Sequence, residues 1–245
     1  MRGRPPERVA VVIPAKDEAA RIAATVEAAG RISHVDLVVV VDDGSSDATA
    51  QLARAAGAVV IRHPRNRGKA AAMESGAAEV ERRDDQGVGA APSATPRALL
   101  FVDADLEGSA IETGALAAPV LSGEADMTVA VLPPQHESGG GHGFVVRLAR
   151  DGIRKATGFV AAQPLSGMRC LTREAFEAAR PLAGGWGVEV GLTIDVLRGG
   201  YRLQEVPCEL QHRVTGRDLN AQLHRAAQYR DVARALAARR FRARH

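Results

Sequence analysis

The stretch Ala98-Leu-Leu-Phe-Val-Asp-Ala-Asp-Leu106 decides the expected fold, because a short apolar run ends in it on two carboxylates. A run of this length favours a buried strand, which would bring Asp103 and Asp105 to the carboxyl edge of a sheet. Side chains alternate along a strand, so both carboxylates would point to one side and repel each other. A hard divalent cation with oxygen ligands would relieve that repulsion. The structural alternative makes Asp105 the N-cap of a helix over residues 110–122.

Strand-like and helix-like segments alternate around this stretch. Short β-branched or apolar runs predict strands, and apolar residues at helical spacing predict the helices between them. The run at 35–41 is continuously apolar, which is typical of a strand covered on both faces. The pattern predicts an α/β fold with a mostly parallel central sheet and helices on both faces. Strands are expected over 8–14, 35–41, 58–62 and 126–132, and helices up to residue 29, over 48–56 and over 70–80.

The second half changes character but is expected to belong to the same compact domain, with halves at 1–132 and 133–245. The polar stretch 81–97 predicts a surface loop, and the glycine-rich stretch 133–143 predicts either a flexible lid or a plain connection. Thr172 is placed to cap a short helix. A helix is expected over 144–157, another up to residue 197, a last strand over 201–210, and a basic helix over 217–241. The inner stripe of that last helix would be Leu219, Leu223, Ala226, Ala233 and Leu236.

Length and composition bound the class of protein. The chain has 245 residues and a net charge of +3, with no apolar run of about 18 residues that would cross a membrane. Its start lacks the features of a signal peptide, so a cytoplasmic protein is expected. Cys170 and Cys208 sit among apolar neighbours, which favours reduced, buried thiols. No nucleic-acid partner is expected; for the basic C-terminal helix we favour a role in covering the sheet over contact with a membrane surface or a homodimer partner.

Several turns carry residues suited to ligand binding. The turn Asp42-Asp-Gly-Ser-Ser-Asp47 follows a strand at the edge where open α/β sheets bind ligands, so Asp42 and Asp43 are candidates to accept hydrogen bonds from a base or ribose. Gly68 and Lys69 open a helix and would hold phosphate, although the spacing of a Walker loop is absent. Trp186 is framed by glycines, which suits a sugar platform or a core position.

Together, these motifs resemble those of glycosyltransferases with the GT-A fold, whose sheet is Rossmann-like. The resemblance is greatest to the glucosyl-3-phosphoglycerate synthases, while the dolichyl-phosphate mannose synthases share the motifs of the first half. It covers nearly the whole chain. The motifs are Val-Val-Ile-Pro-Ala-Lys-Asp-Glu18, Val-Asp-Asp-Gly-Ser-Ser-Asp47, Gly68-Lys69, Phe-Val-Asp-Ala-Asp105, Gln-Pro-Leu-Ser-Gly167, Gly-Val-Glu-Val-Gly-Leu-Thr-Ile-Asp195 and Gln211-His-Arg213.

The resemblance implies roles for individual residues. Asp105 and His212 match metal ligands, which suits Mg²⁺ or Mn²⁺. Asp105, Lys69 and Glu189 are the implied catalytic residues, and Glu189 would orient an acceptor hydroxyl. The alternatives are a surface histidine at 212 and a helix N-terminal acid at 189. The implied nucleotide-sugar site contains Pro14, Ala15, Lys16, Glu18, Asp42, Asp43, Ser45, Lys69, Asp103 and Ala104. The implied acceptor site contains Gly167, Met168, Arg169, Trp186, Gly187 and Glu189.

One segment departs from that family. Where the synthases carry Gly-Arg-Val-Thr for the acceptor's phosphate and carboxylate, this chain has Gly143-Phe-Val-Val146. Neither Phe144 nor Val146 can pair with a charged acid. Either Arg147, Arg150 or Arg169 substitutes, or the acceptor is larger or more apolar, such as a polyprenyl phosphate.

The sequence therefore predicts a metal-dependent hexosyltransferase that uses a nucleoside diphosphate sugar, with UDP-glucose as the expected donor and a small anionic or phosphate-bearing acceptor other than 3-phosphoglycerate. The alternatives are a polyprenyl-phosphate hexosyltransferase using a GDP- or UDP-sugar, a noncatalytic sugar-nucleotide-binding protein, and a nucleotidyltransferase. A nucleotidyltransferase would carry a glycine- and arginine-rich loop after the first strand, where this chain has Pro14-Ala-Lys-Asp-Glu18. Inversion and retention at the anomeric carbon both stay open.

Overall fold

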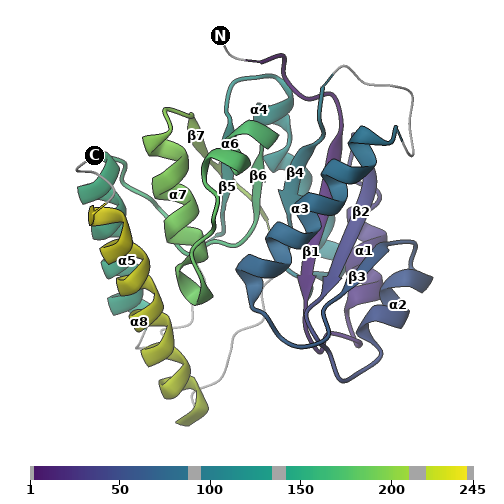
Figure 1. Cartoon of the computed structure of the whole chain (residues 1–245), viewed down its shortest axis with the longest axis horizontal. Coiled ribbons are helices and arrows are strands. Elements are labelled where there is room, and N and C mark those ends of the chain that lie inside the picture. The colour runs from purple at the N-terminus through teal and green to yellow at the C-terminus, as the bar shows by residue number, and fades with distance from the viewer. Residues whose placement is uncertain (1–2, 88–94, 134–141, 210–218, 242–245) are drawn as a thin grey trace.

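The computed structural model describes residues 3–87, 95–133, 142–209 and 219–241 (Figure 1). Strands and helices alternate through the first half, as the sequence pattern predicts. The strands are β1 (Val9–Ala15), β2 (Val35–Asp42), β3 (Val59–Arg62), β4 (Ala98–Phe101), β5 (Met127–Val131), β6 (Arg169–Leu171) and β7 (Leu203–Pro207). The helices are α1 (Ile22–Ala29), α2 (Thr49–Ala55), α3 (Lys69–Asp85), α4 (Ala118–Leu121), α5 (His142–Thr157), α6 (Arg173–Ala178), α7 (Val188–Arg198) and α8 (Leu219–Phe241), with 3-10 helices η1 (Glu107–Leu116) and η2 (Gly185–Gly187).

The described strands form one sheet in the order β3-β2-β1-β4-β6-β5-β7. Every pairing is parallel except those of β6, which runs antiparallel to both β4 and β5. Since β6 comes from the second half of the chain and lies between two strands of the first half, the two halves share one sheet. The expected α/β fold with a mostly parallel sheet is confirmed.

Both faces of the sheet are covered, which explains the continuously apolar strands. Alternate residues of β1 face opposite layers: Val11 packs with α1 and η1, and Val12 packs with α3 and α7. A further layer forms beyond α7, where α5 and α8 lie side by side (Figure 1). These three helices pack together through a separate apolar cluster that includes Val145, Val190 and Val232.

Several boundaries differ from the sequence-based expectation. The strand at 98 ends at Phe101, so Asp103 and Asp105 lie in the turn after it. The segment 110–122 is mainly the 3-10 helix η1, whose N-cap is Leu106 rather than Asp105. The prediction of a loop from residue 81 is wrong at its start, because α3 continues to Asp85. Ion pairs of Glu79 with Arg82 and Arg83 extend that helix, as pairs three and four residues apart do.

Other expectations are confirmed or fall outside the described residues. Thr172 caps α6 by accepting a hydrogen bond from the Ala175 amide. Both cysteines are free and buried, and burial raises the pKa of the Cys170 thiol to about 12. No described helix combines the length and the apolar character needed to cross a membrane. Most of the proposed lid at 133–143 lies outside the described residues.

Candidate active site

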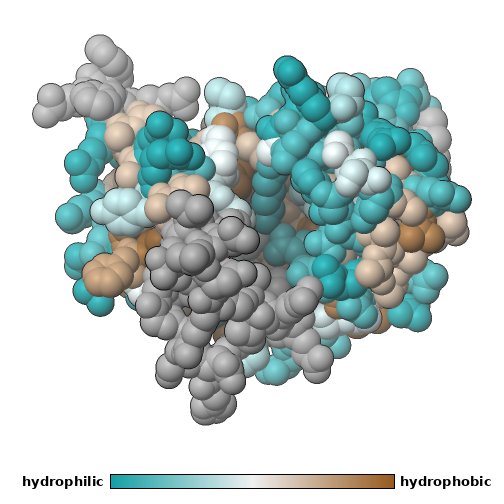
Figure 2. Space-filling model, turned by 90° about the horizontal axis from the view of Figure 1, so that it is seen from below, coloured by the Kyte–Doolittle hydropathy of each residue, from teal (hydrophilic) through white to brown (hydrophobic). Residues whose placement is uncertain are grey.

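A cavity of about 590 Å³ opens at the carboxyl edge of β1 and β4. It is bounded by the loops after β1, β2 and β4, the start of α3, and the start of α7. The face that contains this edge is hollowed, and much of its described surface is hydrophilic (Figure 2). The cavity is lined by Pro14, Ala15, Lys16, Glu18, Asp43, Asn66, Gly68, Lys69, Ala72, Asp103, Ala104, Asp105, Gly185, Trp186 and Glu189.

Lys69 links the two halves of the chain inside this cavity. Its Nζ lies 2.9 Å from Asp103 Oδ1 and 3.2 Å from Glu189 Oε1. Burial alone would lower the Lys69 pKa, but the negative charges of Asp103 and Glu189 outweigh it and raise the pKa above its ordinary value. Glu189 lies in the first turn of α7, where the helix dipole favours a negative charge. The arrangement therefore holds one fixed cation between two carboxylates.

Gly167 allows this arrangement because it has no side chain. A Cβ atom at Gly167 would lie 2.5 Å from Lys69 Nζ and 3.0 Å from Asp103 Oδ1. The backbone before β6 therefore presses directly against the ion pair. A larger residue there would have to displace the ammonium or the carboxylate.

Asp105 differs from Asp103 in its surroundings. It lines the same cavity, yet no described residue forms a hydrogen bond or ion pair with its carboxylate. Among the residues that the structure describes, no group of three His, Cys, Asp or Glu side chains could hold a metal ion. The other expected ligand, His212, lies outside the described residues. Asp105 is therefore an open carboxylate, whereas Asp103 is already paired.

Asp42 and Ser45 lie behind the cavity wall. Asp42 is buried, and its Oδ1 accepts a hydrogen bond from the Ser45 amide at 2.9 Å while Arg62 Nε lies 3.1 Å from Oδ2. Ser45 Oγ accepts from the amide of Asp17 at 2.9 Å, which joins this turn to the loop after β1. Neither residue is part of the cavity lining. Their contacts fix the shape of the wall on the side of the expected nucleotide.

Some of the expected acceptor residues line the cavity, and others are buried behind it. Trp186 lines the cavity with 41% of its surface exposed, whereas Met168, Arg169 and Gly187 are buried and do not line it. Arg169 donates from Nε to the Ser166 carbonyl and from Nη1 to Thr193 Oγ1. Burial lowers the pKa of Arg169 to about 10, with Glu189 and Glu205 opposing the change. The structure therefore places Arg169 behind the wall beside Glu189.

Three lining residues were not singled out from the sequence: Asn66, Ala72 and Gly185. Gly185 belongs to the glycine-rich turn around Trp186, so the sequence pattern at Trp186 could have indicated it. Ala72 lies one turn into α3, and no sequence pattern indicates that it lines a cavity. The arginines on either side of Asn66, at positions 65 and 67, do not line the cavity.

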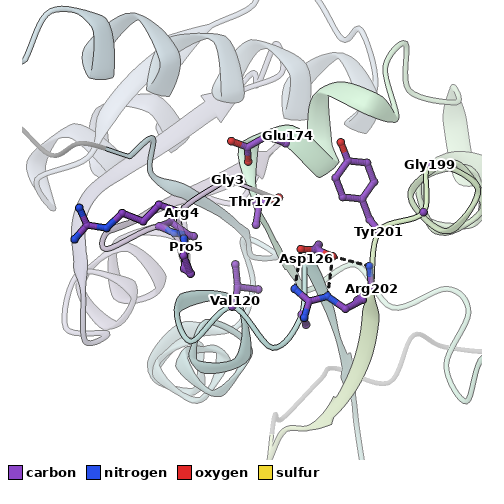
Figure 3. A pocket seen from close by; sticks show the side chains of 14 residues that line it. Gly3, Arg4, Pro5, Val120, Asp126, Thr172, Glu174, Gly199, Tyr201 and Arg202 are labelled. Atoms are coloured by element: carbon purple, nitrogen blue, oxygen red, sulfur yellow. Dashed lines mark hydrogen bonds and ion pairs between the residues drawn. The ribbon is translucent and has the colours of Figure 1, made fainter. Parts of the chain in front are cut away.

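A second cavity, of about 410 Å³, lies at the opposite edge of the sheet (Figure 3). One charged pair in it is already formed: Asp126 accepts hydrogen bonds from the backbone amide and the guanidinium of Arg202. Glu174 and Tyr201 line it from α6 and the segment before β7. The expected ligand-binding residues lie at the other edge.

Comparisons with known proteins agree with this geometry. The sequence model of glycosyl transferase family 2 matches residues 10–157. A glucosyl-3-phosphoglycerate synthase of Mycolicibacterium paratuberculosis is 31% identical over 206 residues, which cover 76% of this chain and 59% of that relative. An uncharacterised protein of Methanocaldococcus jannaschii is 26% identical over 82% of this chain and 80% of its own.

Solved structures show the same likeness. The glucosyl-3-phosphoglycerate synthase of Mycobacterium tuberculosis in complex with Mn²⁺, UDP-glucose and phosphoglyceric acid matches with a TM-score of 0.73 and 27% identity, over 95% of this chain and 79% of that one. The same enzyme with Mg²⁺ and UDP matches with a TM-score of 0.74 and 28% identity, over 95% and 79%.

The fold and the cavity thus define an α/β protein of the GT-A class with a polar site at the carboxyl edge of its sheet. The chain belongs to glycosyl transferase family 2, and it is a glycosyltransferase. It spans about 60% of the length of the curated mycobacterial synthases that it matches.

Proposed function

We propose that this chain transfers a hexose from a nucleoside diphosphate sugar, with UDP-glucose as the expected donor, to a phosphate-bearing acceptor. The observation that supports this most directly is the cavity that combines the Lys69 ammonium, the paired Asp103 and the open Asp105. In addition, 95% of this chain matches the structure of a synthase in complex with UDP-glucose.

The residues at the cavity fit a divalent cation such as Mg²⁺ or Mn²⁺, because Asp105 presents an oxygen donor that has no described partner. Asp105, together with His212 outside the described residues, would hold the ion. Such an ion, when bound, supplies a Lewis acid for the negative charge of the leaving diphosphate. Neighbouring structures contain Mn²⁺ with UDP-glucose and Mg²⁺ with UDP.

We assign the other side chains roles on the basis of their positions. Lys69 would donate hydrogen bonds to a diphosphate oxygen, because its ammonium is fixed and charged. Asp103 would orient Lys69 and accept from the ribose. Glu189, held at the start of α7, would accept a hydrogen bond from the acceptor hydroxyl. Preorganised charges of this kind are effective because they need no rearrangement as the transition state forms.

A thermal-shift panel with UDP, GDP and their glucose and mannose conjugates, each with and without Mn²⁺, tests the donor. Ligand at about 100 times its Kd stabilises a protein by about 2.7 kcal/mol, so a true donor will raise the Tm measurably. We expect UDP-glucose with Mn²⁺ to give the largest shift and slow release of UDP. Release of pyrophosphate, or no shift with any nucleotide, would contradict the proposal.

The acceptor is proposed to differ from 3-phosphoglycerate. Phe144, where the synthases carry arginine, is 74% exposed near the start of α5, and the Arg147 guanidinium lies 5.9 Å from its ring. An exposed phenyl ring cannot bind a carboxylate or phosphate, and it favours a polyprenyl phosphate as the second candidate acceptor.

Acceptor-dependent UDP release will distinguish these candidates. We expect a water-soluble short-chain polyprenyl phosphate or another phosphate ester to outperform 3-phosphoglycerate. The double variant Phe144→Arg with Val146→Thr restores the arginine and threonine of the synthases, and it should gain activity with 3-phosphoglycerate. Full activity of the unmodified chain with 3-phosphoglycerate would refute the proposed difference.

A further inference from the structure

His63 is a buried histidine next to the site that none of the proposed roles uses. Its ring is only 4% exposed and lies between two side chains. Nδ1 is 2.6 Å from Asp43 Oδ1, and Nε2 is 3.0 Å from Ser75 Oγ. In a neutral ring, an Nδ1–H donated to the carboxylate leaves Nε2 to accept from the serine hydroxyl. His63 follows β3, Asp43 follows β2 and Ser75 belongs to α3, so the ring joins three elements.

Asp43 in turn holds the backbone that leads into α3. Its Oδ1 accepts from the Arg67 amide at 2.8 Å, and its Oδ2 accepts from the Gly68 amide at 2.7 Å. Gly68 is the N-cap of α3, so Asp43 fixes the two backbone amides that come immediately before the helix. The carboxylate is buried, which makes its three donors necessary.

The two loops also touch backbone to backbone. A Cβ atom at Gly44 would lie 2.6 Å from the Arg65 carbonyl carbon and 2.7 Å from the Asn66 nitrogen, and the Gly44 φ is +73°. Only glycine suits a position that is both left-handed and this crowded. The close approach lets the Asp43 side chain reach the Gly68 amide.

These contacts end at Lys69, the first residue of α3. The turn before Lys69 is held by Asp43, and the helix after it is held through Ser75, with His63 connecting the two. The Lys69 backbone is therefore fixed on both sides, while its ammonium reaches Asp103 and Glu189. A shift of about 1 Å in a positioned group can cost about a hundredfold in rate.

The order Ser75, His63, Asp43 also matches the arrangement of a nucleophilic triad. The surroundings argue against that role. Neither Ser75 nor His63 lines the cavity, and the ring is nearly inaccessible to solvent. A nucleophile there would have no substrate within reach.

We propose that His63 is a positioning residue that, through Asp43, holds the Lys69 ammonium where it meets the donor diphosphate; the part that concerns the diphosphate rests on the proposed function. Two substitutions separate a hydrogen-bonding role from a packing role. In His63→Asn the amide nitrogen takes the place of Nδ1 and keeps the bond to Asp43. In His63→Gln the larger side chain preserves more volume but aims its amide toward Ser75.

Labelling of lysine side chains by an amine-reactive reagent, read by mass spectrometry, tests the position of Lys69 without any substrate. The exposed Lys155 serves as the internal standard. We expect labelling of Lys69 relative to Lys155 to rise about tenfold in His63→Gln and to stay near the wild-type value in His63→Asn. Equal labelling in all three proteins, or a larger rise in His63→Asn, would overturn the proposal. Ser75→Ala, with a smaller expected rise, replaces His63→Gln if that variant fails to fold.

Kinetics with UDP-glucose and Mn²⁺ test the link to the donor. His63→Gln should lower kcat/KM about a hundredfold in the wild-type background and change it by less than about twofold in a Lys69→Met background. The same factor in both backgrounds would show a role independent of Lys69 and overturn the proposal. If Lys69 labelling responds as expected but the wild-type protein turns over no sugar nucleotide, the proposed function fails and the positioning role stands.

Discussion

The two edges of the sheet both gather charged side chains, and they use them in opposite ways. At the amino edge, Arg97 is 1% exposed and pairs with Asp36 at 2.6 Å and also with Asp84. At the carboxyl edge, Lys69 pairs with Asp103, but Asp105 beside them has no described partner and lines a cavity. Among the described residues, the first cluster pairs its charges with one another, whereas the second leaves the Asp105 carboxylate without a hydrogen bond or ion pair.

This difference separates charges that stabilise the fold from charges that await a ligand. A buried ion pair must be matched within the protein, because an unmatched charge away from water is costly. A charge that is to bind substrate must keep part of its hydrogen-bonding capacity unused, and it stays tolerable because the open cavity admits water. Substitutions at the carboxyl edge should therefore affect activity, and substitutions at the amino edge should affect stability.

The largest effect is expected at the open carboxylate. Asp105→Asn should lower kcat/KM with UDP-glucose about a thousandfold, about 4 kcal/mol, because the neutral amide no longer attracts the cation that would bind the diphosphate. The Tm should change little, since no described contact is lost. Asp151→Asn, at an exposed acid on α5 paired with Arg154, is the matched control and should keep full activity. Wild-type activity in Asp105→Asn would remove the basis of the proposed mechanism.

The next largest effect is a loss of stability, and it is expected in the ion-pair cluster around Arg97. Arg97→Met should lower the free energy of unfolding by about 3 kcal/mol, because Asp36 and Asp84 lose their buried partner. Urea unfolding measures this loss, and steady-state kinetics should give an unchanged kcat/KM. The expected cost is at the low end for buried pairs because Arg8 and Arg173 also lie near these two acids. An activity loss that matches that of Asp105→Asn would mean that the two edges are not independent.

A smaller effect is expected where the backbone presses on the ion pair. Gly167→Ala should lower kcat/KM about thirtyfold, about 2 kcal/mol, because its Cβ would displace the Lys69 ammonium or Asp103. The Tm should fall less, since the Lys69 side chain is flexible. Gly108→Ala is the matched control, because a Cβ at that glycine would meet nothing within 4 Å. A similar loss of kcat/KM in both variants would show a general cost of replacing glycine in this part of the chain.

The sequence was sufficient to identify which residues belong to the site, but not which of them form ion pairs with one another. Asp103 and Asp105 were recognisable at the end of an apolar strand, and Lys69 at the start of a helix, because these positions follow from local pattern. Nothing local distinguishes the paired Asp103 from the open Asp105, since the difference arises from a lysine 34 residues earlier. For the same reason His63 gave no signal: its partners come from β2 and α3.

The fold was also predictable where it depends on local sequence patterns and unpredictable where it depends on contacts between distant residues. Alternating strands and helices predicted the parallel part of the sheet, because hydrophobic spacing is a local property. The place of β6 between β4 and β5 depends on pairing with strands that lie about 70 and about 40 residues earlier in the sequence, and no pattern within β6 shows it. The helix boundary at Asp85 was missed because side-chain ion pairs, rather than apolar spacing, extend α3.

The smallest effect is expected at the amino-edge cavity of Figure 3. Arg202→Met removes the guanidinium that pairs with Asp126 at 3.1 Å but leaves the backbone amide of residue 202 to donate to the same carboxylate at 2.7 Å. Because the Arg202 side chain is 38% exposed, the pair is screened by water, and the loss of stability in urea unfolding should be smaller than that of Arg97→Met. Kinetics with UDP-glucose should be unchanged. A change in kcat/KM with unchanged stability would show instead that this cavity communicates with the carboxyl edge through β5 and β7, and the division of labour between the two edges would then be wrong.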